Sequence, residues 1–189
     1  MNNLGKTISK IAAKLDEMER RQDEVLALNR ELVRDCAKTI SSVHSGDLKN
    51  AKEFERKADE NAKKLFALQK ELEKNASGAF QEYAEVKCLM AILEKKPLPD
   101  YEKLGVDYRA FLSGLADTVG ELRRAMLIAL RHKNRKEAEY LFESMESIYD
   151  KLMVLKYSSS LVGALKSKQD SIRAQVEKAR SELLEIKVR

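Results

Sequence analysis

A chain of 189 residues is long enough to bury a hydrophobic core, and we expect one domain over residues 1–189. Charged residues make up 35% of the chain, and only 7 Gly and 2 Pro interrupt it, which is a helical composition that leaves no strand to predict. The net charge of +5 permits a polyanionic partner, but it fits a plain Lys-rich surface equally well.

The two cysteines, Cys36 and Cys88, lie inside helical patterns. They lack the Cys-x-x-Cys spacing that marks a zinc site or a disulfide framework. The sequence shows neither a signal-peptide pattern nor an apolar run of membrane-spanning length. We therefore expect a cytoplasmic protein with reduced thiols.

Apolar residues at steps of three and four predict a first helix over residues 3–44, which Ser45-Gly46 ends. Such a helix is about 60 Å long. It is longer than a domain of this size needs, so we expect one end to be available for packing on a partner chain. Asp47 is the expected N-cap of a second helix over residues 48–74, with a boundary at residues 75–78.

A third helix is predicted over residues 79–94, and Pro97 and Pro99 separate it from a fourth over residues 106–132. A fifth helix follows Lys133-Asn134, with apolar residues repeating from Ala138 to Leu152. After a break at residues 158–160, a last helix is predicted over residues 161–186. The fold class is therefore all-α, a bundle of about six to seven helices.

Two acidic clusters lie on the third and fourth predicted helices. Glu82 and Glu85 share one helix face, and so do Asp117 and Glu121, because residues three and four apart are neighbours on a helix. If the two helices fold back on each other, four carboxylates meet, and such a set suits Mg²⁺ or Mn²⁺. A bound ion of this kind supports phosphodiester hydrolysis. The alternative is an ordinary solvated acidic surface.

Glycines and arginines accompany the second acidic cluster. Gly114 and Gly120 each cost a helix roughly 1 kcal/mol relative to alanine, so we expect another helix backbone or a ligand to approach closely there. Arg123 and Arg124 are placed to bind a phosphate.

Basic residues also follow the first predicted helix, including Arg30, Arg34 and Lys38, and a basic stripe suits a nucleic-acid backbone. The alternative is an ordinary helix surface balanced by nearby Glu and Asp. His44 and His132 are expected at the surface or at helix ends, and neither has a Ser or Cys partner for nucleophilic catalysis.

The acidic motifs carry a family resemblance. Glu82-Tyr83-Ala84-Glu85, followed by the stretch from Gly114 through Asp117 and Gly120-Glu121 to Leu122, resembles the translin superfamily, in particular its Trax (translin-associated factor X) branch. The first helix agrees at Asn29-Arg30-Glu31, Lys38-Thr39-Ile40 and His44. The last helix agrees at Lys168-Gln169 and Val176-Glu177. The similarity extends from about Asp23 to the end of the chain.

This resemblance implies an all-α subunit that assembles into a hollow shell, usually an octamer, which binds RNA and single-stranded DNA inside. It implies a Mg²⁺-dependent endoribonuclease that acts on small RNA, with Glu82, Glu85, Asp117 and Glu121 as catalytic and metal-binding residues. It also implies RNA binding by Arg30, Lys38 and His44, to which the basic stripe and the acidic motif add Arg34, Arg123 and Arg124.

The chain is shorter than typical Trax and has no extended basic N-terminal segment, so we expect a minimal form similar to archaeal Trax-like proteins. Such forms assemble without a translin partner. Two other functions stay open from the sequence alone. One is a non-catalytic, translin-like oligomer that binds RNA or single-stranded DNA, and the other is a helical scaffold without a nucleic-acid role.

Overall fold

The computed structural model describes residues 3–72 and 77–185, and these residues form helices without a strand. The helices are α1 (Leu4–His44), α2 (Leu48–Leu72), α3 (Ser77–Leu93), α4 (Tyr101–Leu104), α5 (Tyr108–Arg131), α6 (Arg135–Met153), α7 (Ser159–Val162) and α8 (Leu165–Glu185). The all-α prediction is confirmed, and the six long helices are the six that apolar periodicity predicted. The predicted ends at residues 73–74 and 186 lie outside the described residues.

The two single-turn helices, α4 and α7, were not predicted. In α4 the Asp100 side chain accepts a hydrogen bond from the Glu102 amide at 2.8 Å, and Gly105 closes the turn in the left-handed region at φ 71°. The predicted start of the last helix at residue 161 is wrong. Residues 161–162 belong to α7, and Gly163, at φ 60°, separates it from α8, which begins at Leu165.

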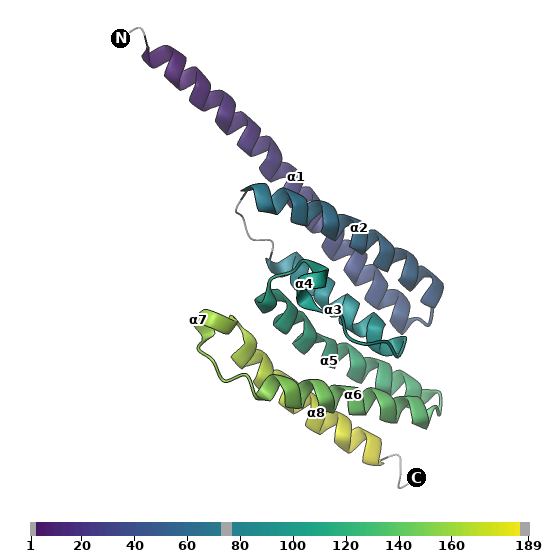
Figure 1. The fold of residues 1–189 in the computed structure, drawn as a ribbon. Coiled ribbons are helices and arrows are strands. Elements are labelled where there is room, and N and C mark those ends of the chain that lie inside the picture. Colours follow the sequence, from purple (N-terminus) through teal and green to yellow (C-terminus); the bar gives the residue numbers. More distant parts are fainter. Residues whose placement is uncertain (1–2, 73–76, 186–189) are drawn as a thin grey trace.

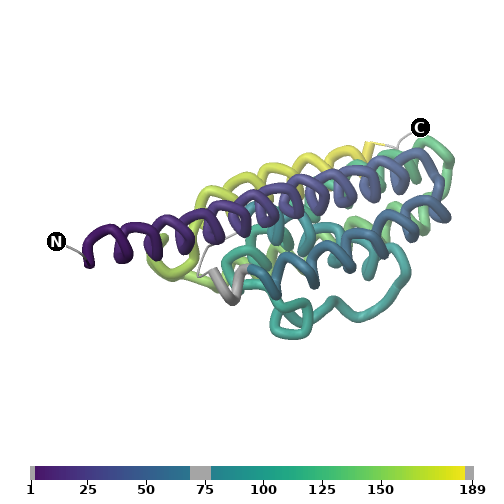
Figure 2. The backbone as a smooth tube through the Cα atoms, turned by 90° about the horizontal axis from the view of Figure 1, so that it is seen from above, coloured from purple at the N-terminus to yellow at the C-terminus, as the bar shows by residue number. Residues whose placement is uncertain are grey.

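The helices lie in three layers (Figures 1 and 2). The first layer is the antiparallel pair of α1 and α2, the second is α3 with α5, and the third is α6 with α8. α3 lies between two hydrophobic clusters and contributes Leu89 to the cluster of α5, α6 and α8, and Val86 to the cluster of α1 and α2. Because α3 is apolar on two sides, its polar side chains are confined to narrow stripes.

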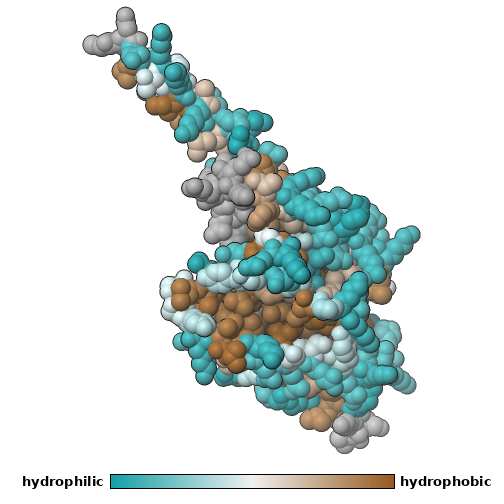
Figure 3. Space-filling view, viewed as in Figure 1, coloured by the Kyte–Doolittle hydropathy of each residue, from teal (hydrophilic) through white to brown (hydrophobic). Residues whose placement is uncertain are grey.

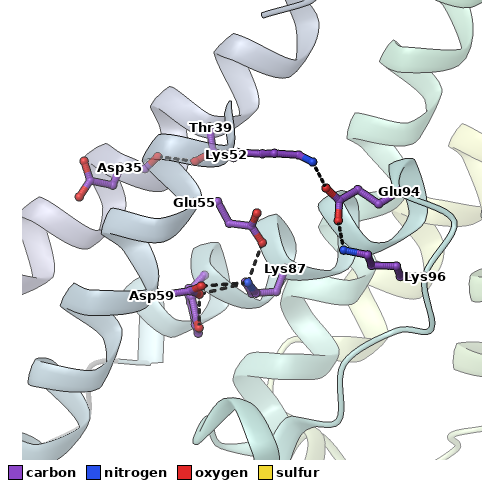
Figure 4. A network of polar contacts seen from close by, with 9 residues as sticks. Asp35, Thr39, Lys52, Glu55, Asp59, Lys87, Glu94 and Lys96 are labelled. Atoms are coloured by element: carbon purple, nitrogen blue, oxygen red, sulfur yellow. Dashed lines mark hydrogen bonds and ion pairs between the residues drawn. The ribbon is translucent and has the colours of Figure 1, made fainter. Parts of the chain in front are cut away.

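One of these polar stripes holds α3 against α2. Lys87 donates to Glu55 at 2.6 Å and to Asp59 at 3.2 Å, and all three side chains are at least partly buried (Figure 4). The Tyr83 hydroxyl donates to the same Asp59 at 2.7 Å. At the end of the helix, Glu94 pairs with Lys52 of α2. These contacts fix the rotation of α3 about its axis, which determines where its other stripe points.

The first half of α1 extends beyond the rest of the molecule (Figure 1). The apolar seam of the helix is continuous, but only its second half is covered. Val25 and Leu32 are buried, whereas Ile8, Ile11, Leu15 and Met18 are between 45% and 57% exposed. Figure 3 shows hydrophobic surface along the projecting end. The expectation that one end of this helix is available to a partner agrees with this geometry.

Cys36 and Cys88 are both buried and free. Burial raises the pKa of Cys88 to about 12, so its thiol stays protonated and unreactive near neutral pH. Within the described residues, no helix combines the length and the apolarity needed to cross a membrane.

Candidate functional site

The site is built where α3 crosses α5, and Gly114 sets how closely the two helices approach. A Cβ at Gly114 would clash with the Gln81 carbonyl oxygen and would lie 2.8 Å from the Glu85 amide nitrogen and 2.9 Å from Ala84 Cβ. One turn along α5, the buried Thr118 hydroxyl donates to the Gly114 carbonyl at 2.9 Å. The expectation of a close approach is confirmed here, and the approaching group is the backbone of α3.

This crossing brings the two predicted acidic pairs together. Glu85 is only 7% exposed. Its burial, together with the charges of Glu82, Asp117 and Glu121, raises its pKa to about 8. Burial and the charge of Asp117 also raise the pKa of Glu82. The charges that act on Glu82 and Glu85 show that the four carboxylates form one electrostatic cluster, and such a cluster gains from a cation.

Lys168 of α8 and His44 of α1 reach the cluster from outside α3 and α5. Lys168 of α8 forms an ion pair with Asp117 Oδ1, and the Gln81 side-chain amide donates to Asp117 Oδ2 at 2.7 Å. His44, the last residue of α1, contacts Glu121 Oε2 through Nε2. The acidic cluster is therefore surrounded by α1, α3, α5 and α8.

The donor set suits a hard divalent ion, because it consists of carboxylate oxygens that already repel one another. As the side chains lie, however, no group of three His, Cys, Asp or Glu among the described residues is arranged to hold one metal ion. Asp117 is directed to Lys168 and Glu121 to His44. Metal binding would require Asp117 and Glu121 to turn away from these partners.

Comparisons with known proteins support the fold and the family. No protein-family model matches the sequence. The chain is 34% identical over 169 residues to the uncharacterized protein MJ0175 of Methanocaldococcus jannaschii, covering 86% of this chain and 75% of that protein. The crystal structure of AfC3PO matches with a TM-score of 0.89 and 32% identity, over 96% of this chain and 97% of AfC3PO.

The chain belongs to the translin superfamily and is Trax-like.

Two further solved structures are similar to this chain. AfC3PO in its complex with duplex RNA matches this Trax-like chain with a TM-score of 0.87 and 31% identity, over 96% of this chain and 97% of that one. Apo-NeC3PO matches with a TM-score of 0.85 over 94% of this chain and 95% of its own, and at 22% identity it shows the shared fold alone.

In the structure of this Trax-like chain, the predicted RNA-binding residues do not form one surface. Arg30, Arg34 and Lys38 are exposed at successive turns of α1, and the Lys38 ammonium lies 5.0 Å from the centre of the Phe54 ring. Arg123 is paired instead with Glu182 of α8.

The other predicted residues lie near the last turns of α1 and α5. Arg124 is exposed and lies beside His44. His44 ends α1, as expected for a residue at the surface or at a helix end, and its side chain is only 4% exposed. His132 is exposed at the C-cap of α5, as expected.

Sequence reasoning missed Lys168 and Gln81 as neighbours of the acidic cluster. Gln81 lies directly before Glu82, so its place on α3 was a usable signal. Lys168 is 51 residues from Asp117, and no spacing rule within one helix connects them. The only signal for Lys168 was its place in the Lys168-Gln169 pair that supported the family resemblance.

Proposed function

We propose that this Trax-like chain is a Mg²⁺-dependent endoribonuclease that acts on small RNA inside a hollow homo-oligomeric shell. The observation that carries the proposal is the Gly114 crossing, beside which Asp117 and Glu121 of α5 lie close enough to Glu82 and Glu85 of α3 to help raise the pKa of both. Support for RNA as the ligand comes from AfC3PO, which has the same fold, is 31% identical, and has been solved with duplex RNA.

In this proposal Glu82, Glu85, Asp117 and Glu121 hold Mg²⁺, or Mn²⁺, through carboxylate oxygens. A bound ion of this type orients a water molecule and offsets the negative charge of the phosphate. Glu85 has a raised pKa and carries a proton near neutral pH without a cation, so it must release that proton to become a ligand. The Gln81 amide orients Asp117 from one side.

The test is RNA cleavage in Mg²⁺ by the variants Glu82→Ala and Asp117→Ala. We expect each to lower the cleavage rate at least about 100-fold, because each removes a ligand of the ion that offsets the negative charge developing on the phosphate. RNA binding should persist. Glu60→Ala, on the exposed face of α2, is the matched control and should cleave normally. Full cleavage by both site variants would refute the assignment.

A second candidate function is RNA or single-stranded DNA binding without cleavage. The observation that favours it is the ion pair of Asp117 with Lys168, which neutralises one carboxylate of the cluster without a metal. In that case binding would weaken steeply with added salt, and Mg²⁺ would produce no cleavage.

Self-association is supported by the uncovered seam of α1. Burying an exposed Ile or Leu side chain contributes at most about 1.5–3 kcal/mol, and Ile8, Ile11, Leu15 and Met18 line one side of the projecting helix. We expect Ile11→Asp to lower the particle mass measured by light scattering. Ala13→Asp places the same charge away from the seam and should leave the mass unchanged. If both variants have the same particle mass as the wild type, the seam is not a contact between subunits.

A further inference from the structure

The turn from α1 to α2 and the turn from α5 to α6 lie at the same end of the molecule (Figures 1 and 2). A shallow groove beside the acidic cluster is lined by residues near this end. Its volume is about 350 Å³, and its lining residues are His44, Arg124, Leu127, Ile128 and Arg131. The four residues from α5 follow one another at steps of three, one and three, so they lie along one face of the last two turns.

The two arginines of this groove differ from most other arginines of α5, α6 and α8. Arg123 is paired with Glu182, Arg135 with Glu139 and Arg180 with Glu146. For Arg124 and Arg131, in contrast, the described part of the chain contains no ion pair. The guanidinium groups of Arg124 and Arg131, about two helical turns apart and with Leu127 and Ile128 between them, make this groove cationic.

His44 connects this groove to the acidic cluster. His44 lines the groove, and its Nε2 contacts Glu121 Oε2. Within the described residues, His44 Nδ1 is buried without a hydrogen-bond partner. His44 therefore lies between the carboxylates, which attract a cation, and the two arginines, which attract an anion.

We propose that this groove binds a phosphate group of the RNA strand that neighbours the phosphate at the acidic cluster. Arg124 and Arg131 bind its oxygens, since a guanidinium matches phosphate geometry, and Leu127 and Ile128 contact the attached nucleoside. The proposal rests on the proposed RNA binding but not on cleavage. It adds Arg131 to the RNA-binding residues. It also implies that the RNA strand passes His44 between the acidic cluster and the groove.

The experiment measures binding of a fluorescent short RNA by anisotropy in EDTA, at several salt concentrations. Each phosphate contact contributes about 0.7–0.9 to the slope of log K against log salt. We expect Arg124→Met and Arg131→Met each to weaken binding about fivefold or more and to lower the slope by roughly this amount. Arg131→Lys should retain the slope. Arg56→Met, which removes one exposed charge from α2, is the control for net charge.

A second arm distinguishes an RNA phosphate from a free one. Inorganic phosphate, compared with chloride at equal ionic strength, should not displace the RNA from the wild type. Displacement by inorganic phosphate together with unchanged slopes in the two Met variants would identify a free-anion site and overturn the proposal. Wild-type slopes in both Met variants would also overturn it, and RNA binding itself would stand. Absence of RNA binding by the wild type would instead refute the proposed function, and this inference with it.

Discussion

The substitution Gly114→Ala tests how the site is assembled. The added methyl group would meet the Gln81 carbonyl oxygen, the Glu85 amide and Ala84 of α3. Two of these three neighbours are backbone atoms, so neither can rotate away, and α3 and α5 must move apart. Overpacking of this kind costs about 1–3 kcal/mol, or more where backbone must shift. The gain in helix propensity offsets about 1 kcal/mol of that cost.

Gly120 supplies the matched control on the same helix. A Cβ there would lie 3.2 Å from the nearest atom of Gln175, and that atom belongs to a flexible side-chain amide. Gly120→Ala therefore gains helix propensity with little steric cost, and we expect it to be neutral or more stable by up to about 1 kcal/mol. We expect Gly114→Ala to be less stable than the wild type by about 1–2 kcal/mol.

Urea unfolding followed by circular dichroism measures both effects. If Gly114→Ala proves as stable as Gly120→Ala, the close approach at this crossing does not hold the site together. Separation of α3 from α5 should also weaken Mn²⁺ binding in Gly114→Ala, because Glu82 and Glu85 would move away from Asp117.

Two further predictions concern the charges of the acidic cluster. The pKa of Glu85 in the folded chain, about 8, lies above its ordinary value of 4.5, so the protonated form stabilises the fold. In EDTA the free energy of unfolding should fall by at most about 5 kcal/mol as pH rises from about 4.5 to about 8. In urea titrations, Glu85→Gln should flatten this dependence on pH. A wild-type profile that rises over this range would contradict the expectation. Lys168→Met removes the cation that competes for Asp117, so we expect Mn²⁺ to bind about threefold to tenfold more tightly in calorimetry. Weaker Mn²⁺ binding would show that Lys168 supports the metal site instead of competing with it.

Much of the fold was predictable because it depends on local patterns. Apolar steps of three and four locate the long helices, and Ser45-Gly46 and the prolines at 97 and 99 locate breaks between them. α4 was missed because a single turn has no periodicity. Its signal was the pair of Asp100 as N-cap and Gly105 as C-cap. Gly163 carried a similar signal for the separation of α7 from α8.

The site was predictable only in part, because its assembly depends on contacts between helices. Helical spacing pairs Glu82 with Glu85 and Asp117 with Glu121, and Gly114 indicates a close approach without naming the approaching group. Neither feature predicts that Lys168 or His44 reaches the carboxylates. His44 was expected at the surface or at a helix end, and it does end α1, but spacing within one helix does not predict that α5 covers its side chain.

The two sides of α3 explain how one short helix can hold such a cluster. Lys87 and Tyr83 bind Asp59 on the side of α2, and this network fixes the helix rotation. Gly114 fixes its distance from α5 on the other side. Glu85 is consequently buried next to other carboxylates, an arrangement that costs stability until a cation or a proton neutralises it.

The most direct test of the account is a calorimetric titration of Mn²⁺ into the wild type and into Glu82→Gln and Asp117→Asn, one variant on α3 and one on α5. The account predicts one ion per chain for the wild type and loss of that binding in each variant, because both helices supply ligands. Mn²⁺ binding that is undiminished in either variant would contradict a shared metal site between α3 and α5.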